Sequence, residues 1–113
     1  MITHIVLLKP KASLTASERD ALLEAMRVAF SNIPEIERVR VGKRKLIGSG
    51  YEAQMTADHE FACVIEFHDE PALRKYLEHP AHAELGKLFF MTAESALVYD
   101  FEMVEPARIR ELL

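Results

Sequence analysis

The sequence contains only one cysteine, Cys63, and this scarcity excludes two kinds of stabilising site. A single thiol cannot form a disulfide within the chain, and it cannot supply the several thiolates of a structural zinc site. Cys63 lies in an apolar run, so we expect a buried, inert thiol rather than a reactive one.

The sequence also lacks an excess of positive charge and any long apolar run. The formal net charge is −4 at pH 7, whereas a surface that binds nucleic-acid phosphates needs an excess of lysine and arginine. No apolar run approaches the ~18 residues of a membrane span, and the N-terminus has no signal-peptide pattern. We therefore expect a cytoplasmic protein with no nucleic-acid partner and no membrane association.

Phosphate-binding signatures are lacking as well. The stretch Gly48-Ser49-Gly50 has neither the lysine nor the spacing of a phosphate-binding loop. A local basic run is interpreted as the exposed edge of a strand, with an anion or partner site as the alternative. This run consists of Arg38, Arg40, Lys43, Arg44 and Lys45.

The hydrophobic pattern predicts four strands. The chain has 113 residues, half of them hydrophobic, which suffices for one domain with its own core. Residues 1–10 are apolar without alternation, as in a strand covered on both faces. Residues 36–45 and 59–68 alternate between apolar and polar side chains, and so do residues 96–104, which is typical of strands with two different faces.

Two helical regions separate these strands. Thr15 and Glu18 have the spacing of a capping box, and apolar residues then recur at intervals of three and four until Pro34. Asp69 is a suitable N-cap for a second helix, and Pro80 interrupts this helix and opens another.

The order of these elements predicts an α+β fold. Two βαβ halves suggest a ferredoxin-like βαββαβ sandwich, in which a four-stranded antiparallel sheet carries its helices on one face. Residues 1–105 would form this domain, and residues 106–113 would form a tail with a short helical turn. Residues 46–58 show no period and predict a mobile loop.

The sheet face without helices would meet water in a lone domain. Burial of apolar surface is worth roughly 25 cal/mol per Å², and monomers rarely expose large apolar patches. We therefore predict a homodimer in which the two sheets pack face to face about a two-fold axis. The residues expected on this face are Val6, Leu8, Ala62, Val64 and Val98.

Four segments of the chain resemble one known family. They are THIVLLKPK near the start, VRVGK, YLEHPAH at residues 76–82, and VYDFE. Over residues 2–104 the chain resembles the stress-responsive dimeric α/β-barrel (Dabb) family, and Y-x-x-H-P-A-H is the most specific of these segments. The resemblance implies a dimeric α/β barrel. The family's olivetolic acid cyclase branch catalyses an intramolecular aldol condensation without a metal or organic cofactor.

The resemblance to the cyclase branch implies four catalytic residues. Tyr76 and His82 match its catalytic tyrosine and histidine. Asp100 matches an aspartate that orients the histidine, and His4 matches a histidine of the first strand. Structural roles remain as alternatives: His82 in a packed corner, Tyr76 in the core, His4 in the plain interior, and Asp100 exposed or bonded to the backbone.

The other histidines of these segments are given smaller roles. His79 stands before Pro80, where it is expected to cap a helix. His79 and His82 lack a third ligand at a recognisable distance, so no metal site is expected. A further pocket histidine of the cyclase branch is replaced by Phe61, with His59 two residues earlier, and this departure leaves the substrate open.

Three functions are compatible with these features. The first is a cofactor-independent lyase or cyclase that acts on a small keto-rich or aromatic molecule through histidine and tyrosine acid–base chemistry. The second is a non-enzymatic, stress-related oligomeric protein in which the corner residues only pack. The third is a cofactor-free monooxygenase, which the fold permits without indicating it.

Overall fold

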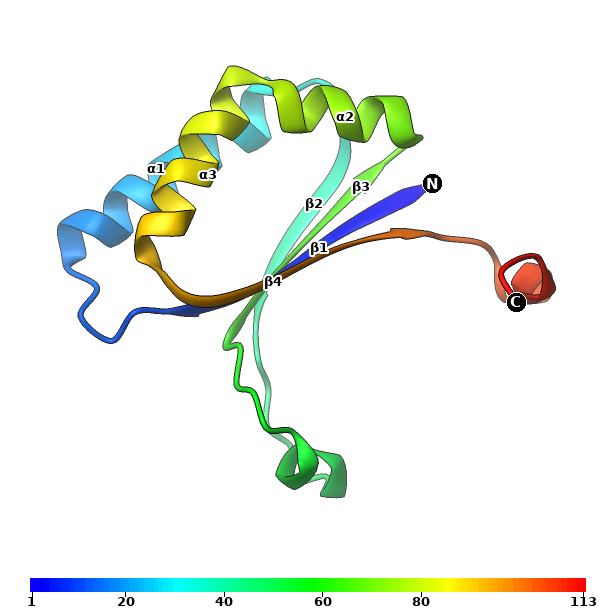
Figure 1. Ribbon diagram of the computed structural model, residues 1–113, viewed down its shortest axis with the longest axis horizontal. Coiled ribbons are helices and arrows are strands. Elements are labelled where there is room, and N and C mark those ends of the chain that lie inside the picture. The colour runs from blue at the N-terminus through cyan, green and yellow to red at the C-terminus, as the bar shows by residue number, and fades with distance from the viewer.

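The computed structural model describes residues 1–113, with α-helices packed on one face of a four-stranded antiparallel sheet (Figure 1). The strands are β1 (Ile2–Pro10), β2 (Ile36–Lys43), β3 (Phe61–Phe67) and β4 (Ala93–Glu102). The helices are α1 (Ala16–Asn32), α2 (Glu70–Glu78) and α3 (Pro80–Thr92). The strands lie in the order β2-β3-β1-β4, and every neighbouring pair is antiparallel. This arrangement confirms the predicted ferredoxin-like fold.

Helix α1 begins at the predicted capping box. The Thr15 hydroxyl oxygen accepts a hydrogen bond from the Glu18 N–H at 3.1 Å, and the Glu18 carboxylate accepts one from the Thr15 N–H at 3.0 Å. These two bonds satisfy backbone donors that the first helical turn leaves free. The helix ends at Asn32, with Ile33 as its C-cap, just before Pro34.

The corner between α2 and α3 is built by His79 and Pro80. His79 is the C-cap of α2 and also the N-cap of α3, where its Nδ1 accepts a hydrogen bond from the Ala81 N–H at 3.0 Å. Pro80 takes the first position of α3, where a backbone N–H has no helical partner to lose. The structure thus confirms the capping role predicted for His79 and the helix break predicted at Pro80.

Two segments differ from the prediction. The expected loop 46–58 contains a 3-10 helix, η1 (Gly50–Gln54), because the Glu52 carboxylate accepts hydrogen bonds from the backbone N–H groups of Ile47 and Ser49. Strand β4 begins at Ala93, which is earlier than the expected residue 96. The C-terminal segment forms a second 3-10 helix, η2 (Pro106–Glu111), as the expected helical turn.

The register of the sheet corrects the expected assignment of faces. Val6 lies opposite Cys63 and Val98, while Ile5 lies opposite Val64. Because neighbours along a strand point to opposite faces, an error of one residue reverses the assignment of a whole strand. Val6, Leu8 and Val98 therefore line the helix side, whereas Ala62 and Val64 lie on the bare face as predicted. The bare face also carries Ile5, Leu7, Leu97, Tyr99 and Phe101.

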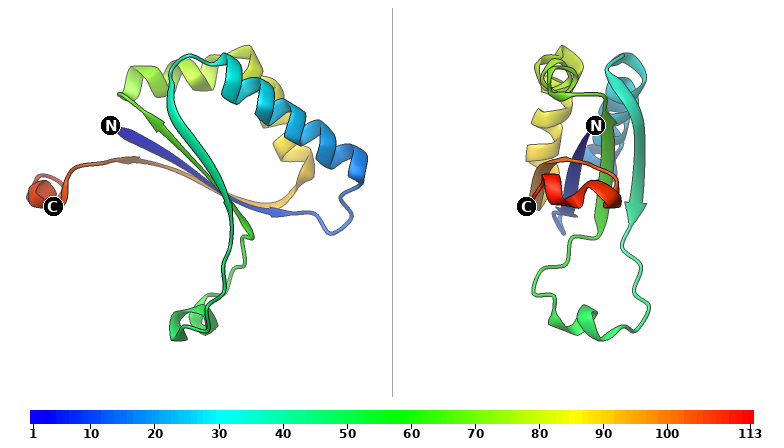
Figure 2. Two further views of the ribbon diagram at one scale, coloured as in Figure 1. Left: turned by 180° about the vertical axis from the view of Figure 1, so that it is seen from behind. Right: turned by 90° about the vertical axis from the view of Figure 1, so that its right-hand side faces the viewer.

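The chain buries few residues and is extended for its length. Only 12 of its 113 residues are buried, and nine of them form one hydrophobic core between the three helices and β3. The radius of gyration is 15.6 Å, against about 13 Å for a compact domain of this size. The η1 and η2 segments account for this difference, because both project away from the sheet and helices (Figures 1 and 2).

None of the helices combines the length and apolar character that a membrane crossing requires.

Candidate active site

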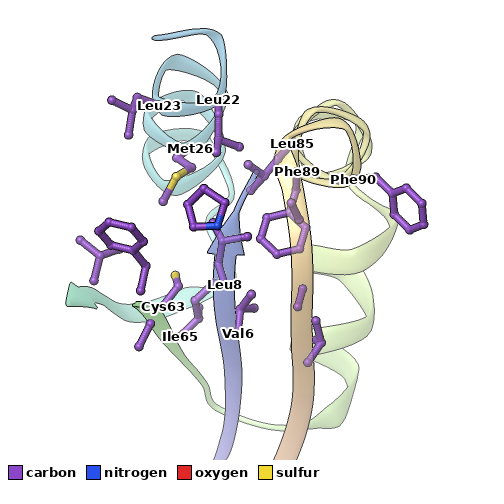
Figure 3. Close-up of a pocket in the computed structure, with 18 of the residues that line it drawn as sticks. Val6, Leu8, Leu22, Leu23, Met26, Cys63, Ile65, Leu85, Phe89 and Phe90 are labelled. Atoms are coloured by element: carbon purple, nitrogen blue, oxygen red, sulfur yellow. The ribbon is translucent and has the colours of Figure 1, made fainter. Parts of the chain in front are cut away.

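A cavity of about 1030 Å³ lies between the helices and the sheet. Its walls come from all three helices and all four strands, and Figure 3 shows side chains of α1, α3, β1 and β3 around a common space. Hydrophobic residues make up 20 of the 29 that line it. A mostly apolar concavity of this size can enclose a small organic ligand, provided that a few polar groups fix its orientation.

The first polar group in the cavity wall is a histidine paired with a carboxylate. His4 and Asp100 lie directly opposite each other on the neighbouring strands β1 and β4, and His4 Nδ1 is 2.6 Å from Asp100 Oδ1. The His4 side chain is 5% exposed, whereas that of Asp100 is 42% exposed. A carboxylate on Nδ1 favours the tautomer in which Nδ1 carries the proton, so Nε2 is free to exchange a proton.

Tyr76 of α2 lies between the two histidines of the cavity. Its ring centroid is 5.8 Å from that of His4 and 4.7 Å from that of His82, both in edge-on geometry. The residue is 2% exposed and belongs to the core, yet it also lines the cavity. Burial, reinforced by the neighbouring Cys63 thiol, raises the pKa of Tyr76. The phenol is therefore a proton-bearing hydrogen-bond donor at neutral pH.

His82 of α3 completes this polar cluster. Burial lowers the pKa of His82 from its usual 6.5, and the nearby His4 adds to this effect, while the Leu77 backbone carbonyl opposes it. The imidazole is therefore neutral at pH 7 and able to accept a proton. His4, Tyr76 and His82 thus form the group that we call the polar cluster.

The structure corrects the partner expected for Asp100. The resemblance assigned this carboxylate to His82, but it contacts His4, because β4 pairs with β1 and the register sets the two residues opposite each other. His82 has no carboxylate partner. The resemblance assigned all four residues to one site, but the sequence could not give the strand register that decides which histidine Asp100 contacts.

Cys63 belongs to the cavity wall and was not among the expected site residues. The alternating pattern of β3 already placed it on the same face as Ile65 and Phe67, which are buried against the helices. Burial raises the pKa of the Cys63 thiol to about 11. The thiol is thus protonated at neutral pH, as expected for an inert cysteine.

The other histidines, His59, His68 and His79, lie outside the polar cluster. His59 contacts the Ser95 hydroxyl at 3.0 Å and does not line the cavity, whereas Phe61 does. His79 is occupied by its cap of α3. No group of three or more histidine, cysteine, aspartate or glutamate side chains is arranged to hold a metal ion.

Solved structures with the same fold include two enzymes. A hydroxynitrile lyase from Passiflora edulis is 22% identical with a TM-score of 0.73, over 92% of this chain and 94% of that one. A cofactor-independent oxygenase from Streptomyces nogalater is 12% identical with a TM-score of 0.67, over 92% and 93%. A dimeric ferredoxin-like protein of unknown function from Thermobifida fusca is 20% identical with a TM-score of 0.70, over 90% of each chain.

These identities are too low to show more than a common fold. No curated protein matches the sequence. The model of one family, described as the Stress responsive A/B Barrel Domain, matches residues 2–103, which is nearly the whole chain. The chain therefore belongs to the stress-responsive A/B barrel domain (Dabb) family.

Proposed function

We propose that this protein is a cofactor-independent lyase or cyclase that acts on a small keto-rich or aromatic molecule. The observation that carries the proposal is that His4, which lines the apolar cavity, contacts the Asp100 carboxylate at 2.6 Å. Packing alone does not require a buried histidine with a carboxylate partner, whereas proton transfer does benefit from one.

The polar cluster suits the formation of an enolate. Neutral His82 would take a proton from the carbon beside a carbonyl group, and the Tyr76 hydroxyl would donate a hydrogen bond to the developing enolate oxygen. The enolate carbon would then form a carbon–carbon bond to a second carbonyl group. The protonated His82 would return its proton to the resulting alkoxide, so that neither a redox partner nor a metal takes part.

His4 has a different role in this proposal. With the Nδ1 proton donated to Asp100, its free Nε2 can accept a hydrogen bond from a hydroxyl group of the substrate. The Passiflora edulis and Streptomyces nogalater proteins support catalysis on this fold, since one is named a lyase and the other a cofactor-independent oxygenase. Neither name identifies the substrate of this chain.

We infer that the working form is a homodimer joined through the bare sheet face. Tyr99 is 50% exposed and Phe101 47% exposed on this face in the single chain. The η1 and η2 segments project from two sides of the sheet and flank the bare face (Figures 1 and 2). A second copy would cover these apolar residues, and the similar Thermobifida fusca protein is described as dimeric.

The test of the catalytic proposal begins with a thermal-shift screen of β-keto acids and phenolic ketones. Compounds that raise the Tm are then followed for conversion by the wild type, His82→Ala and the matched surface variant Lys87→Gln. Loss of the general base is expected to reduce kcat of His82→Ala by a factor of about a hundred to ten thousand. The kcat of Lys87→Gln should stay at the wild-type value. The proposal fails if no compound of either class binds, or if His82→Ala converts the ligands as fast as the wild type.

A further inference from the structure

The cavity opens at two edges of the molecule. Leu23 of α1 and Val41 of β2 line the cavity although they are 53% and 63% exposed, so an opening lies between α1 and β2. Phe90 of α3 and Val98 of β4 are 86% and 52% exposed and mark a second opening between α3 and β4. Figure 3 shows Phe90 pointing away from the space that Phe89 faces.

Two cations without partners stand at the opening between α1 and β2. Arg19 precedes Leu23 by four residues on α1, and Lys43 follows Val41 by two residues on β2, so each cation shares the face of its cavity-lining neighbour. Both residues line the cavity, and neither takes part in an ion pair.

The only carboxylate that lines the cavity is already neutralised. It belongs to Glu94, at the start of β4, and it lies 3.2 Å from the Lys9 ammonium group. The opening between α1 and β2 therefore carries an uncompensated positive charge, while the rest of the wall is mostly apolar. A carboxylate at this opening would be attracted by this positive charge, and both cations carry N–H groups that can donate charge-assisted hydrogen bonds to it.

The sheet register sets the distance between these cations and the polar cluster. Lys43 lies opposite Phe61, which lies opposite Leu8, and Leu8 is four residues from His4 along β1. Four residues of a strand span about 13 Å, and two strand spacings span about 10 Å. The two ends of the cavity are therefore roughly 16 Å apart along the diagonal. A long side chain such as that of lysine shortens the distance that a ligand must bridge.

We propose that Arg19 and Lys43 bind the carboxylate of an elongated substrate, whose apolar chain fills the cavity and whose carbonyl end reaches the polar cluster. The inference rests on the proposed function, which assigns the reactive end of the molecule to that cluster. It adds a substrate class, namely medium-chain carboxylates that carry two carbonyl groups at the end remote from the acid, one to form the enolate and one to accept its attack. It also assigns Arg19 and Lys43 as specificity-determining residues of the site.

The test compares decanoate with the uncharged decanamide in isothermal titration calorimetry. The wild type is expected to bind decanoate more tightly than decanamide, with a preference that shrinks as salt is added. In the double variant Arg19→Gln/Lys43→Gln, the affinity for decanoate should fall about tenfold, while that for decanamide stays the same. The double variant Lys75→Gln/Lys87→Gln removes two exposed lysines outside the cavity and should bind both ligands as the wild type does.

Two results would overturn the inference. One is a wild type that binds decanoate no better than decanamide. The other is an equal loss of decanoate affinity in both double variants, which would indicate a general charge effect. The variant His82→Ala separates this inference from the proposed function, because it should retain decanoate binding while losing turnover. If His82→Ala keeps its turnover and the cation variants still lose decanoate, the catalytic roles fail and the carboxylate site stands.

Discussion

At the scale of single residues, the polar cluster is defined by what each group contacts. Asp100 touches His4 and leaves His82 without a carboxylate, so the two histidines are not equivalent. Burial favours the neutral form of His82 and the protonated form of Tyr76, which gives an acceptor and a donor of protons side by side. The members of this cluster were named from the sequence only through its resemblance to the cyclase branch, because no spacing within the chain connects β1 with the corner between α2 and α3. The pairing within it depends on the strand register, which no local pattern specifies.

The substitution Asp100→Asn tests the role of the carboxylate. An amide cannot supply the negative charge that holds the His4 proton on Nδ1, so kcat should fall between about tenfold and a hundredfold. Because Asp100 is 42% exposed, the Tm should change little. The control is Glu102→Gln, which removes a carboxylate from the same strand outside the cavity. Equal kcat values in the two variants would show that Asp100 has no part in catalysis.

At the scale of secondary-structure elements, the corner between α2 and α3 positions the cluster. Tyr76 belongs to α2 and His82 to α3, and His79 and Pro80 fix the turn between the two helices. This corner was predictable because proline and capping residues act locally. The 3-10 helix η1 was missed because its signal, Ser49 followed three residues later by Glu52, lies in a segment without hydrophobic periodicity.

The substitution His79→Ala tests the contribution of the cap. Alanine leaves the Ala81 N–H without an acceptor, and the free energy of unfolding should fall by about 1 kcal/mol in urea titrations. The substitution His79→Asn should retain most of this stability, since the asparagine side chain is among the best N-caps. If asparagine is as destabilising as alanine, the imidazole acts through its packing and not through the hydrogen bond.

At the scale of the whole molecule, the chain on its own is incomplete. Few residues are buried, and the bare sheet face leaves the aromatic side chains Tyr99 and Phe101 half exposed. The need for a cover could be argued from the sequence, because the strands are too apolar for one face to stay in water. The residues on that face could not all be assigned correctly, since Val6, Leu8 and Val98 turned out to face the helices.

The substitution Phe101→Lys tests the proposed dimer. Placing a charge on the bare face should weaken self-association at least about tenfold, because an unpaired charge would be buried between the sheets. Sedimentation velocity should find the wild type dimeric at micromolar concentration. The control is Met91→Lys, which changes an apolar side chain of α3 that is 55% exposed and should leave the dimer intact. A monomeric wild type would contradict the proposal.

The central claim is that neutral His82 acts as the base in the cavity. The most direct measurement is the pH dependence of kcat/KM for a ketone that the protein converts. Since the pKa of His82 lies below its usual 6.5, activity should be constant near pH 7 and should fall at lower pH with a midpoint below 6.5. The free energy of unfolding should decline over the same range, because the unfolded chain takes up the His82 proton first. The predicted result is a kcat/KM that is constant near pH 7 and falls in acid with a midpoint below 6.5. In His82→Gln, kcat/KM should be lower by at least about a hundredfold. A midpoint at or above 6.5, or undiminished turnover in His82→Gln, would contradict the account.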